Sequence, residues 1–173
     1  MMKERLNALE VALKNEMREH EFYELNAKRT KNPVGKAMFE QIAADELEHY
    51  ERLKQLHDQW EKEGKWPETV PLKVDDTAVG NVLKNFLKEA KEAPVTDADD
   101  LKAIRTAIDF EANGATFYAL LRNKVTDPRE KDFFDLMANI EHEHYVSLKE
   151  LEEFFIDPVG WFRRVEKTGL DGA

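Results

Sequence analysis

The chain contains no cysteine among its 173 residues. This absence excludes disulfides, cysteine nucleophiles, cysteine-ligated zinc and every iron–sulfur or rubredoxin-type centre. Long hydrophobic runs are also missing, because no apolar stretch approaches the roughly 20 residues that a membrane-spanning helix requires, and the first residues are charged rather than signal-like. We therefore expect a soluble, unexported, cytoplasmic protein that has no membrane partner.

Basic residues are in deficit, with 26 Lys and Arg against 36 Asp and Glu, for a net charge of −10. This balance argues against nucleic acid as a partner and favours cations. Glycine and proline are scarce, at seven and six residues, while charged residues make up 36%. Few helix breakers in a highly charged chain are typical of long amphipathic helices, so the sequence predicts an all-α protein.

The prolines and glycines divide the chain into long uninterrupted segments. They predict one domain, 1–173, with four long helices at about 3–31, 34–63, 97–126 and 128–156. Residues 64–96 form a long crossover that contains one short helix, 78–90. The C-terminal tail, 157–173, has no repeating pattern, although Trp161 and Phe162 are expected to pack part of it on the bundle.

The sequence repeats itself at an offset of 95 positions, which takes Phe22-Tyr23 to Phe117-Tyr118 and Glu48-His49-Tyr50 to Glu143-His144-Tyr145. The first two helices are thus repeated as the third and fourth. Two helix hairpins joined by a long crossover predict a four-helix bundle with a pseudo-twofold axis.

Carboxylates and histidines interrupt the apolar stripes of all four helices. Glu46 and His49 lie within the stripe of the second helix, and Glu141 and His144 occupy the equivalent places in the fourth. Single glutamates interrupt the stripes of the first and third helices, at Glu16 and Glu111. Four buried carboxylates require counter-charge. Two divalent cations would neutralise them, each taking one imidazole nitrogen, and this oxygen-rich ligand set suits iron or manganese better than zinc.

Two tyrosines, Tyr23 and Tyr118, lie seven residues after Glu16 and Glu111 on the same helix faces. They are either hydrogen-bond donors to the ligands or part of the apolar core, and the sequence does not choose between these roles. The remaining histidines, His20, His57 and His142, are expected to take no part in the site.

The set Glu16, Glu46-x-x-His49, Glu111 and Glu141-x-x-His144, with Tyr23 seven residues after the first glutamate, resembles the di-iron domain of rubrerythrins in the ferritin-like superfamily. The resemblance covers roughly residues 3–156. It implies a ferritin-like bundle with two iron ions, bridged by Glu46 and Glu141, with Glu16 and Glu111 as terminal ligands and His49 and His144 completing the two positions. It also implies reduction of hydrogen peroxide, with two Fe(II) ions supplying two electrons to the O–O bond.

The chain departs from that family in two informative ways. Rubrerythrins usually carry a rubredoxin iron site, which a chain without cysteine cannot form, so electrons must come from an external donor such as a rubredoxin-like protein. Rubrerythrins also place an additional glutamate one turn after the third-helix ligand, where this chain has Gly114. The pseudo-symmetric position in the first helix is Glu19, and we therefore expect Glu19 to act as a seventh ligand.

The leading prediction is a di-iron peroxidase that also reacts with O2. Three other functions are compatible with the same ligand set. One is an iron-binding ferroxidase of the storage type, and another is a manganese catalase-like protein. The third is a bundle in which metal serves stability or regulation without turnover. Storage would require a large hollow assembly, for which the sequence gives no indication. We expect a homodimer.

Overall fold

The computed structural model describes residues 2–67, 75–89 and 95–170. Within this part of the chain the secondary structure is entirely helical: α1 (Met2–Arg29), α2 (Pro33–Glu63), α3 (Val79–Glu89), α4 (Ala98–Lys124), α5 (Pro128–Ile156) and α6 (Pro158–Leu170). The prediction of an all-α protein with four long helices is confirmed. The remaining parts of the predicted crossover and tail lie outside the described residues: 68–74, which contains Pro71, 90–94, which contains Ala90 and Pro94, and 171–173.

Helix ends follow the capping residues of the sequence. The side chain of Asn32 accepts hydrogen bonds from the backbone N–H groups of Val34 and Gly35, both at 3.1 Å, and starts α2. Asn32 has the extended backbone that this role requires, and α1 ends at Arg29, two residues earlier than predicted. Asp97 forms a capping box with Asp100 at the start of α4. Gly64 ends α2 with a left-handed backbone angle φ of 64°.

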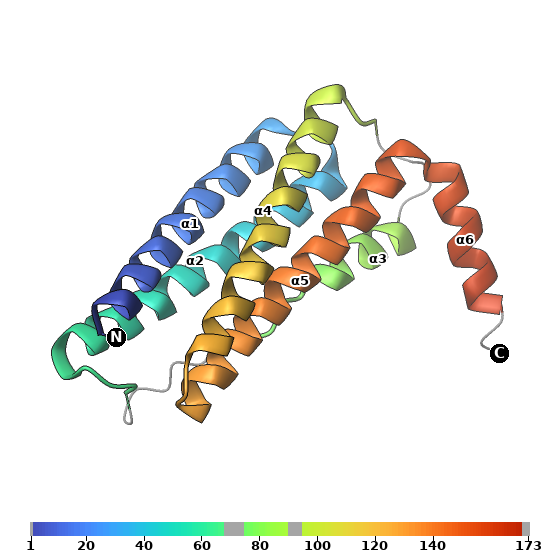
Figure 1. Ribbon diagram of the computed structural model, residues 1–173. Coiled ribbons are helices and arrows are strands. Elements are labelled where there is room, and N and C mark those ends of the chain that lie inside the picture. Colours follow the sequence, from blue (N-terminus) through green and yellow to red (C-terminus); the bar gives the residue numbers. More distant parts are fainter. Residues whose placement is uncertain (1, 68–74, 90–94, 171–173) are drawn as a thin grey trace.

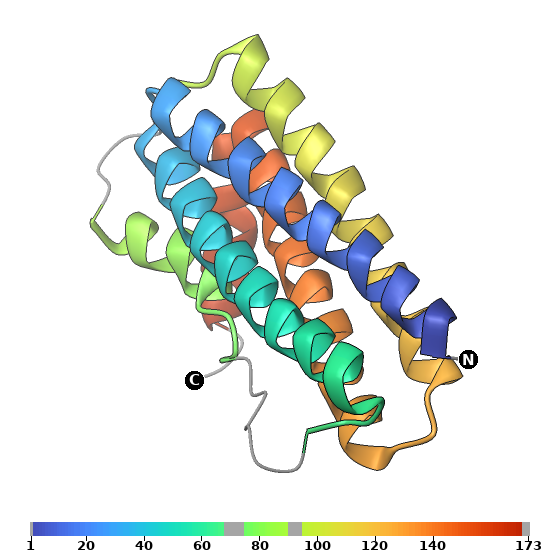
Figure 2. The same cartoon turned by 90° about the vertical axis from the view of Figure 1, so that its left-hand side faces the viewer.

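The four long helices form two antiparallel hairpins, α1–α2 and α4–α5, that face one another (Figure 1). Contacts are extensive within each hairpin and sparse between them. The short helix α3 packs against both α2 and α5 and so covers one seam between the hairpins. Figure 2 shows α1 and α4 next to each other on the side of the bundle away from α3, where no further helix lies over them.

The apolar core is divided into two clusters. One contains Phe39 and Ile42 of α2 with Leu148 and Leu151 of α5, and it includes residues of α3. The other contains Leu53 and Leu56 of α2 together with residues from the first half of α5, up to and including Ile140. In each long helix, the sequence between the two clusters holds a buried glutamate of the predicted ligand set: Glu16, Glu46, Glu111 or Glu141. A polar layer at mid-height therefore separates the two apolar ends of the bundle.

The C-terminal segment forms a helix, α6, where the sequence predicts only a tail. Pro158 looks like a stop signal after α5, but it occupies the first position of α6, where proline is well tolerated. The Asp157 carboxylate accepts a hydrogen bond of 2.9 Å from the Gly160 N–H and supports this first turn. Trp161 and Phe162 pack edge-on against Phe154 of α5, as expected for a segment that docks on the bundle.

None of the described helices is both long enough and apolar enough to cross a membrane.

Candidate metal centre

The six predicted ligands converge at mid-height of the bundle. Each is at most 2% exposed, although all six are polar or charged. They form two groups of four, within each of which the potential ligand atoms lie within 4.8 Å of one another. The groups are Glu16, Glu46, His49 and Glu141, and Glu46, Glu111, Glu141 and His144.

The two groups are related by the sequence repeat and share two members. Glu46 and Glu141 belong to both groups, whereas each group has its own histidine and its own third glutamate. The residues of one hairpin thus complete the group of the other. This is the arrangement expected of two adjacent metal positions bridged by two carboxylates.

Both histidines direct Nδ1 toward the carboxylates. His49 Nδ1 lies 3.1 Å from Glu16 Oε2 and 3.3 Å from Glu141 Oε1. His144 Nδ1 lies 3.2 Å from Glu111 Oε2 and also 3.2 Å from Glu46 Oε1. Each Nδ1 is therefore surrounded by the oxygens that would share a metal with it.

The shared glutamates show that the cluster fits cations. All four carboxylate oxygens of Glu46 and Glu141 are buried and lack a hydrogen bond of good geometry among the described residues, although the Nδ1 atoms of His144 and His49 lie 3.2 and 3.3 Å from two of them. A buried charged oxygen without a hydrogen bond is costly, and such groups in proteins are usually paired or bound to metal. Carboxylate oxygens with one imidazole at each position are ligands that iron and manganese accept.

The close packing of these groups shifts the pKa values of several of them toward the protonated form. Burial raises the pKa of Glu16 to about 8, an effect that the charge of Glu46 reinforces and His49 opposes. Burial and the charges of Glu46, Glu111 and Glu16 hold the pKa of Glu141 well above its usual range. Burial opposes protonation of the histidines, but the neighbouring carboxylates, Glu16 for His49 and Glu111 for His144, outweigh it and raise both pKa values. Metal binding would therefore displace protons from these groups.

The two tyrosines link the hairpins through the candidate ligands. Tyr23 donates a hydrogen bond to Glu111 Oε1, and Tyr118 donates one to Glu16 Oε1. Each tyrosine therefore holds the carboxylate of the opposite hairpin, while its ring is buried in the apolar core. The two roles left open by the sequence are combined in the same side chain.

Glu19 lies beside the cluster but in neither group of four. Its side chain is buried, and its Oε1 lies 3.6 Å from the Arg18 guanidinium. Burial, followed by the charges of Glu46, Glu16 and Glu111, raises the Glu19 pKa to about 10. Gly114, its pseudo-symmetric counterpart, lies against Glu141: a Cβ added there would be 2.5 Å from Glu141 Oε2. The absence of a side chain at residue 114 thus makes room for a shared ligand.

Sequence reasoning missed Asp45. Asp45 Oδ2 accepts a hydrogen bond of 2.9 Å from His144 Nε2, which leaves Nδ1 of that ring available to a metal. Thr77, just before α3, and Gln41 also donate to this carboxylate. Burial alone would raise the Asp45 pKa, but these hydrogen bonds, with that of His144 the largest, lower it. The pseudo-symmetric residue of Asp45 is Ile140, so the repeat gave no signal for this carboxylate. Through Thr77, the crossover takes part in orienting the His144 ligand.

The other histidines lie outside both buried groups. His20 Nδ1 is 2.7 Å from the Ala43 carbonyl oxygen, His57 is near Glu10 and Asp58, and His142 stacks on Tyr145.

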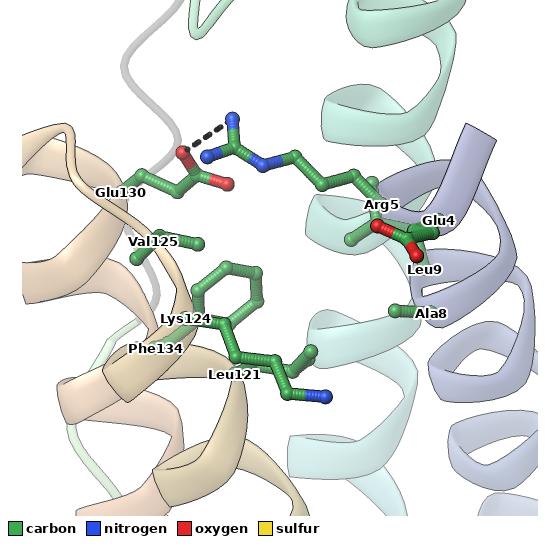
Figure 3. Close-up of a pocket in the computed structure, with 9 residues that line it drawn as sticks. All are labelled: Glu4, Arg5, Ala8, Leu9, Leu121, Lys124, Val125, Glu130 and Phe134. Atoms are coloured by element: carbon green, nitrogen blue, oxygen red, sulfur yellow. Dashed lines mark ion pairs between the residues drawn. The ribbon is translucent and has the colours of Figure 1, made fainter. Parts of the chain in front are cut away.

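A cavity of about 530 Å³ lies at one end of the bundle and away from the cluster (Figure 3). Its floor is apolar, with Leu9 and Phe134, and an ion pair of 3.4 Å between Arg5 and the buried Glu130 lies at its edge. Burial raises the Glu130 pKa, and the Arg5 charge opposes this effect. None of the six predicted ligands lines this cavity, so it is distinct from the metal centre.

The Rubrerythrin family model matches residues 7–152 of the sequence. This chain belongs to the rubrerythrin family. The match spans α1 to α5 almost completely, including every residue of the two groups, and confirms the resemblance inferred from the ligand motif. Rubrerythrins are di-iron carboxylate proteins, and the buried cluster fits such a site. Searches of curated proteins and of solved structures gave no match.

Proposed function

We propose that this rubrerythrin-family protein reduces hydrogen peroxide to water at a di-iron centre, using electrons from an external donor. The observation that carries the proposal is the pair of ligand groups that share Glu46 and Glu141, whose four buried oxygens lack a hydrogen bond of good geometry among the described residues. His49 and Glu16 would complete one iron position, and His144 and Glu111 the other. A pair of Fe(II) ions supplies the two electrons that cleavage of one O–O bond consumes.

The protein side chains would keep the ligands in place during this two-electron, two-proton reduction, in which one peroxide molecule yields two water molecules. Tyr23 and Tyr118 restrain Glu111 and Glu16 by hydrogen bonds, and both tyrosine hydroxyls could supply protons near the carboxylates. The two electrons must be restored by a separate one-electron donor, such as a rubredoxin-like protein in the cytoplasm, because this chain has no cysteine for an iron–sulfur centre.

The proposal is tested by anaerobic loading of the metal-free protein with Fe(II), followed by stopped-flow oxidation with H2O2 and, in parallel, with O2. We expect two irons per chain, oxidised much faster by peroxide than by O2 and reducible again without loss. The His49→Ala variant should lose tight iron binding, whereas the matched control His57→Ala, also on α2, should retain it. Many irons per chain retained as a mineral would support storage instead. Peroxide disproportionation by the manganese form alone would support a catalase, and binding without turnover a purely structural metal.

We also propose that Glu19 is a seventh ligand, since its buried carboxyl group lies beside the cluster. Glu19→Ala should then lower both iron affinity and the rate of peroxide turnover, with about a 10- to 100-fold loss of affinity, as for residues that support a metal site. The exposed Glu21 of the same helix provides the control, Glu21→Ala, which should change neither quantity. Unchanged iron affinity and turnover in Glu19→Ala would contradict the assignment.

A further inference from the structure

A cavity of about 180 Å³ opens at the seam between α1 and α4. Its inner wall includes Glu16 and Tyr118, a candidate ligand and the tyrosine bonded to it, together with Glu19 and Gly114. Gly114 lines the cavity without a side chain, and a Cβ added there would lie 2.5 Å from Glu141 Oε2. The cavity therefore borders the cluster at the terminal carboxylate of Glu16, and one of its lining residues, Gly114, lies against the shared Glu141.

The opposite side of the cluster is covered. His144 extends toward Asp45, which is held by Thr77 just before α3, and α3 itself packs on both α2 and α5. Both histidines come from these two helices, whereas α1 and α4 contribute only single glutamates. A molecule that approaches the cluster through the α1–α4 seam thus meets neither a histidine nor a covering helix (Figure 2).

Arg18 lies at the outer edge of this cavity. Its guanidinium is 5.1 Å from the centre of the Phe110 ring on α4 and 3.6 Å from Glu19 Oε1 on its own helix. These two contacts hold a long side chain across the seam, although 61% of its surface remains exposed. Asn15 and Asn113 contribute polar groups to the same cavity. The outer edge of the cavity is therefore polar, and the Arg18 side chain lies across it.

We propose that this cavity admits and binds the small oxidant, and that Arg18 limits the size of the molecule that can enter. This inference rests on the proposed reduction of peroxide. Hydrogen peroxide is small and uncharged, and it can form hydrogen bonds with the amides and the tyrosine hydroxyl of the wall. A cavity of about 150 Å³ holds a molecule of the size of benzene, so 180 Å³ accepts hydrogen peroxide readily but has too little room for a larger aryl alkyl hydroperoxide.

The first test obstructs the cavity and measures ligand binding rather than turnover. Asn113→Trp places an indole at the edge of the cavity from an exposed position on α4, and Asn85→Trp places the same group on α3, over the opposite seam. The probe is azide, added to the oxidised, iron-loaded protein and followed by its absorption band in stopped flow. We expect Asn113→Trp to slow azide binding by about tenfold or more, within the range by which pocket shape discriminates ligands. Asn85→Trp should bind azide at the wild-type rate.

The second test widens the opening. Arg18→Ala should raise the rate constant for cumene hydroperoxide relative to that for hydrogen peroxide by about tenfold, with iron content unchanged. An unaltered rate of azide binding in Asn113→Trp, or an unaltered ratio of the two hydroperoxides in Arg18→Ala, would overturn the proposal. If wild-type protein is not oxidised by peroxide, the proposed function fails, yet the azide measurement still decides whether this cavity leads to the metals.

Discussion

Replacing Glu141 by glutamine will abolish tight metal binding at both positions and, in the same variant, stabilise the metal-free protein. Glu141 is shared by the two groups, and neither of its oxygens has a hydrogen bond of good geometry among the described residues. Without metal, the Glu141 carboxyl group lies buried beside Glu46, Glu111 and Glu16. Burial and repulsion by these groups both destabilise its charged form. A neutral amide of the same shape removes the repulsion but is a much weaker ligand.

Relative to the wild type, the variant should be less stable when metal is present and more stable when metal is absent. Wild-type protein should gain about 4 kcal/mol at each position when free metal exceeds its Kd a thousandfold, and the variant should gain almost nothing. In metal-free protein the variant should be more stable by at least about 1 kcal/mol, or roughly 2–4 °C in Tm for a chain of this size. Thermal unfolding with and without Fe(II) or Co(II), together with equilibrium dialysis, measures both effects.

The matched control for this variant is Glu150→Gln, an exposed position on the same helix. It should bind two metals and unfold as the wild type does. If Glu141→Gln keeps two tightly bound metals, or if its metal-free form is less stable than the wild type, the assignment of Glu141 as a shared ligand is wrong.

A single methyl group at residue 114 will also weaken both metal positions. In Gly114→Ala the new Cβ would lie 2.5 Å from Glu141 Oε2, closer than real Cβ atoms come to oxygen, so the carboxylate must move. Displacement of a supporting or shared ligand typically lowers metal affinity by about 10- to 100-fold. We expect a loss of this size at both positions, measured by competition with a chromophoric chelator.

Gly80→Ala is the control for the effect of alanine on helix stability. Nothing lies within 4 Å of a Cβ at this position of α3, so metal affinity should not change. The free energy of unfolding should rise by about 0.5–1 kcal/mol, because alanine is the better helix former. Equal metal affinities of Gly114→Ala and wild type would show that the Glu141 carboxylate can shift without leaving its ligand position.

The sequence was sufficient to predict the four long helices and to select the six residues that the structure brings together. Glu46 and His49 interrupt a stripe whose other members, such as Phe39 and Leu53, are apolar, and the repeat presents the same interruption at Glu141 and His144. A polar residue inside an apolar stripe is a strong signal because its burial requires a partner. The repeat then turned one ambiguous motif into a pair.

Other features depend on contacts that periodicity does not contain. The tyrosines could be placed on the correct helix faces, but their hydrogen bonds to the glutamates of the opposite hairpin follow from how the hairpins face one another. Asp45 was missed because its partner, His144, is 99 residues away and its repeat equivalent is Ile140. The start of α6 was missed because Pro158 is equally compatible with ending one helix and beginning the next.

The division of the ligands between two similar hairpins has an evolutionary consequence. Either hairpin alone holds three members of one group and a single member of the other, so an ancestral single hairpin could have formed the whole site by pairing with an identical copy. In such a symmetric pair, any substitution appears twice. Fusion into one chain lets each half change separately, and two of the differences between the halves, Asp45 against Ile140 and Glu19 against Gly114, lie beside the shared carboxylates. Duplication followed by fusion would thus have allowed two identical metal positions to become specialised.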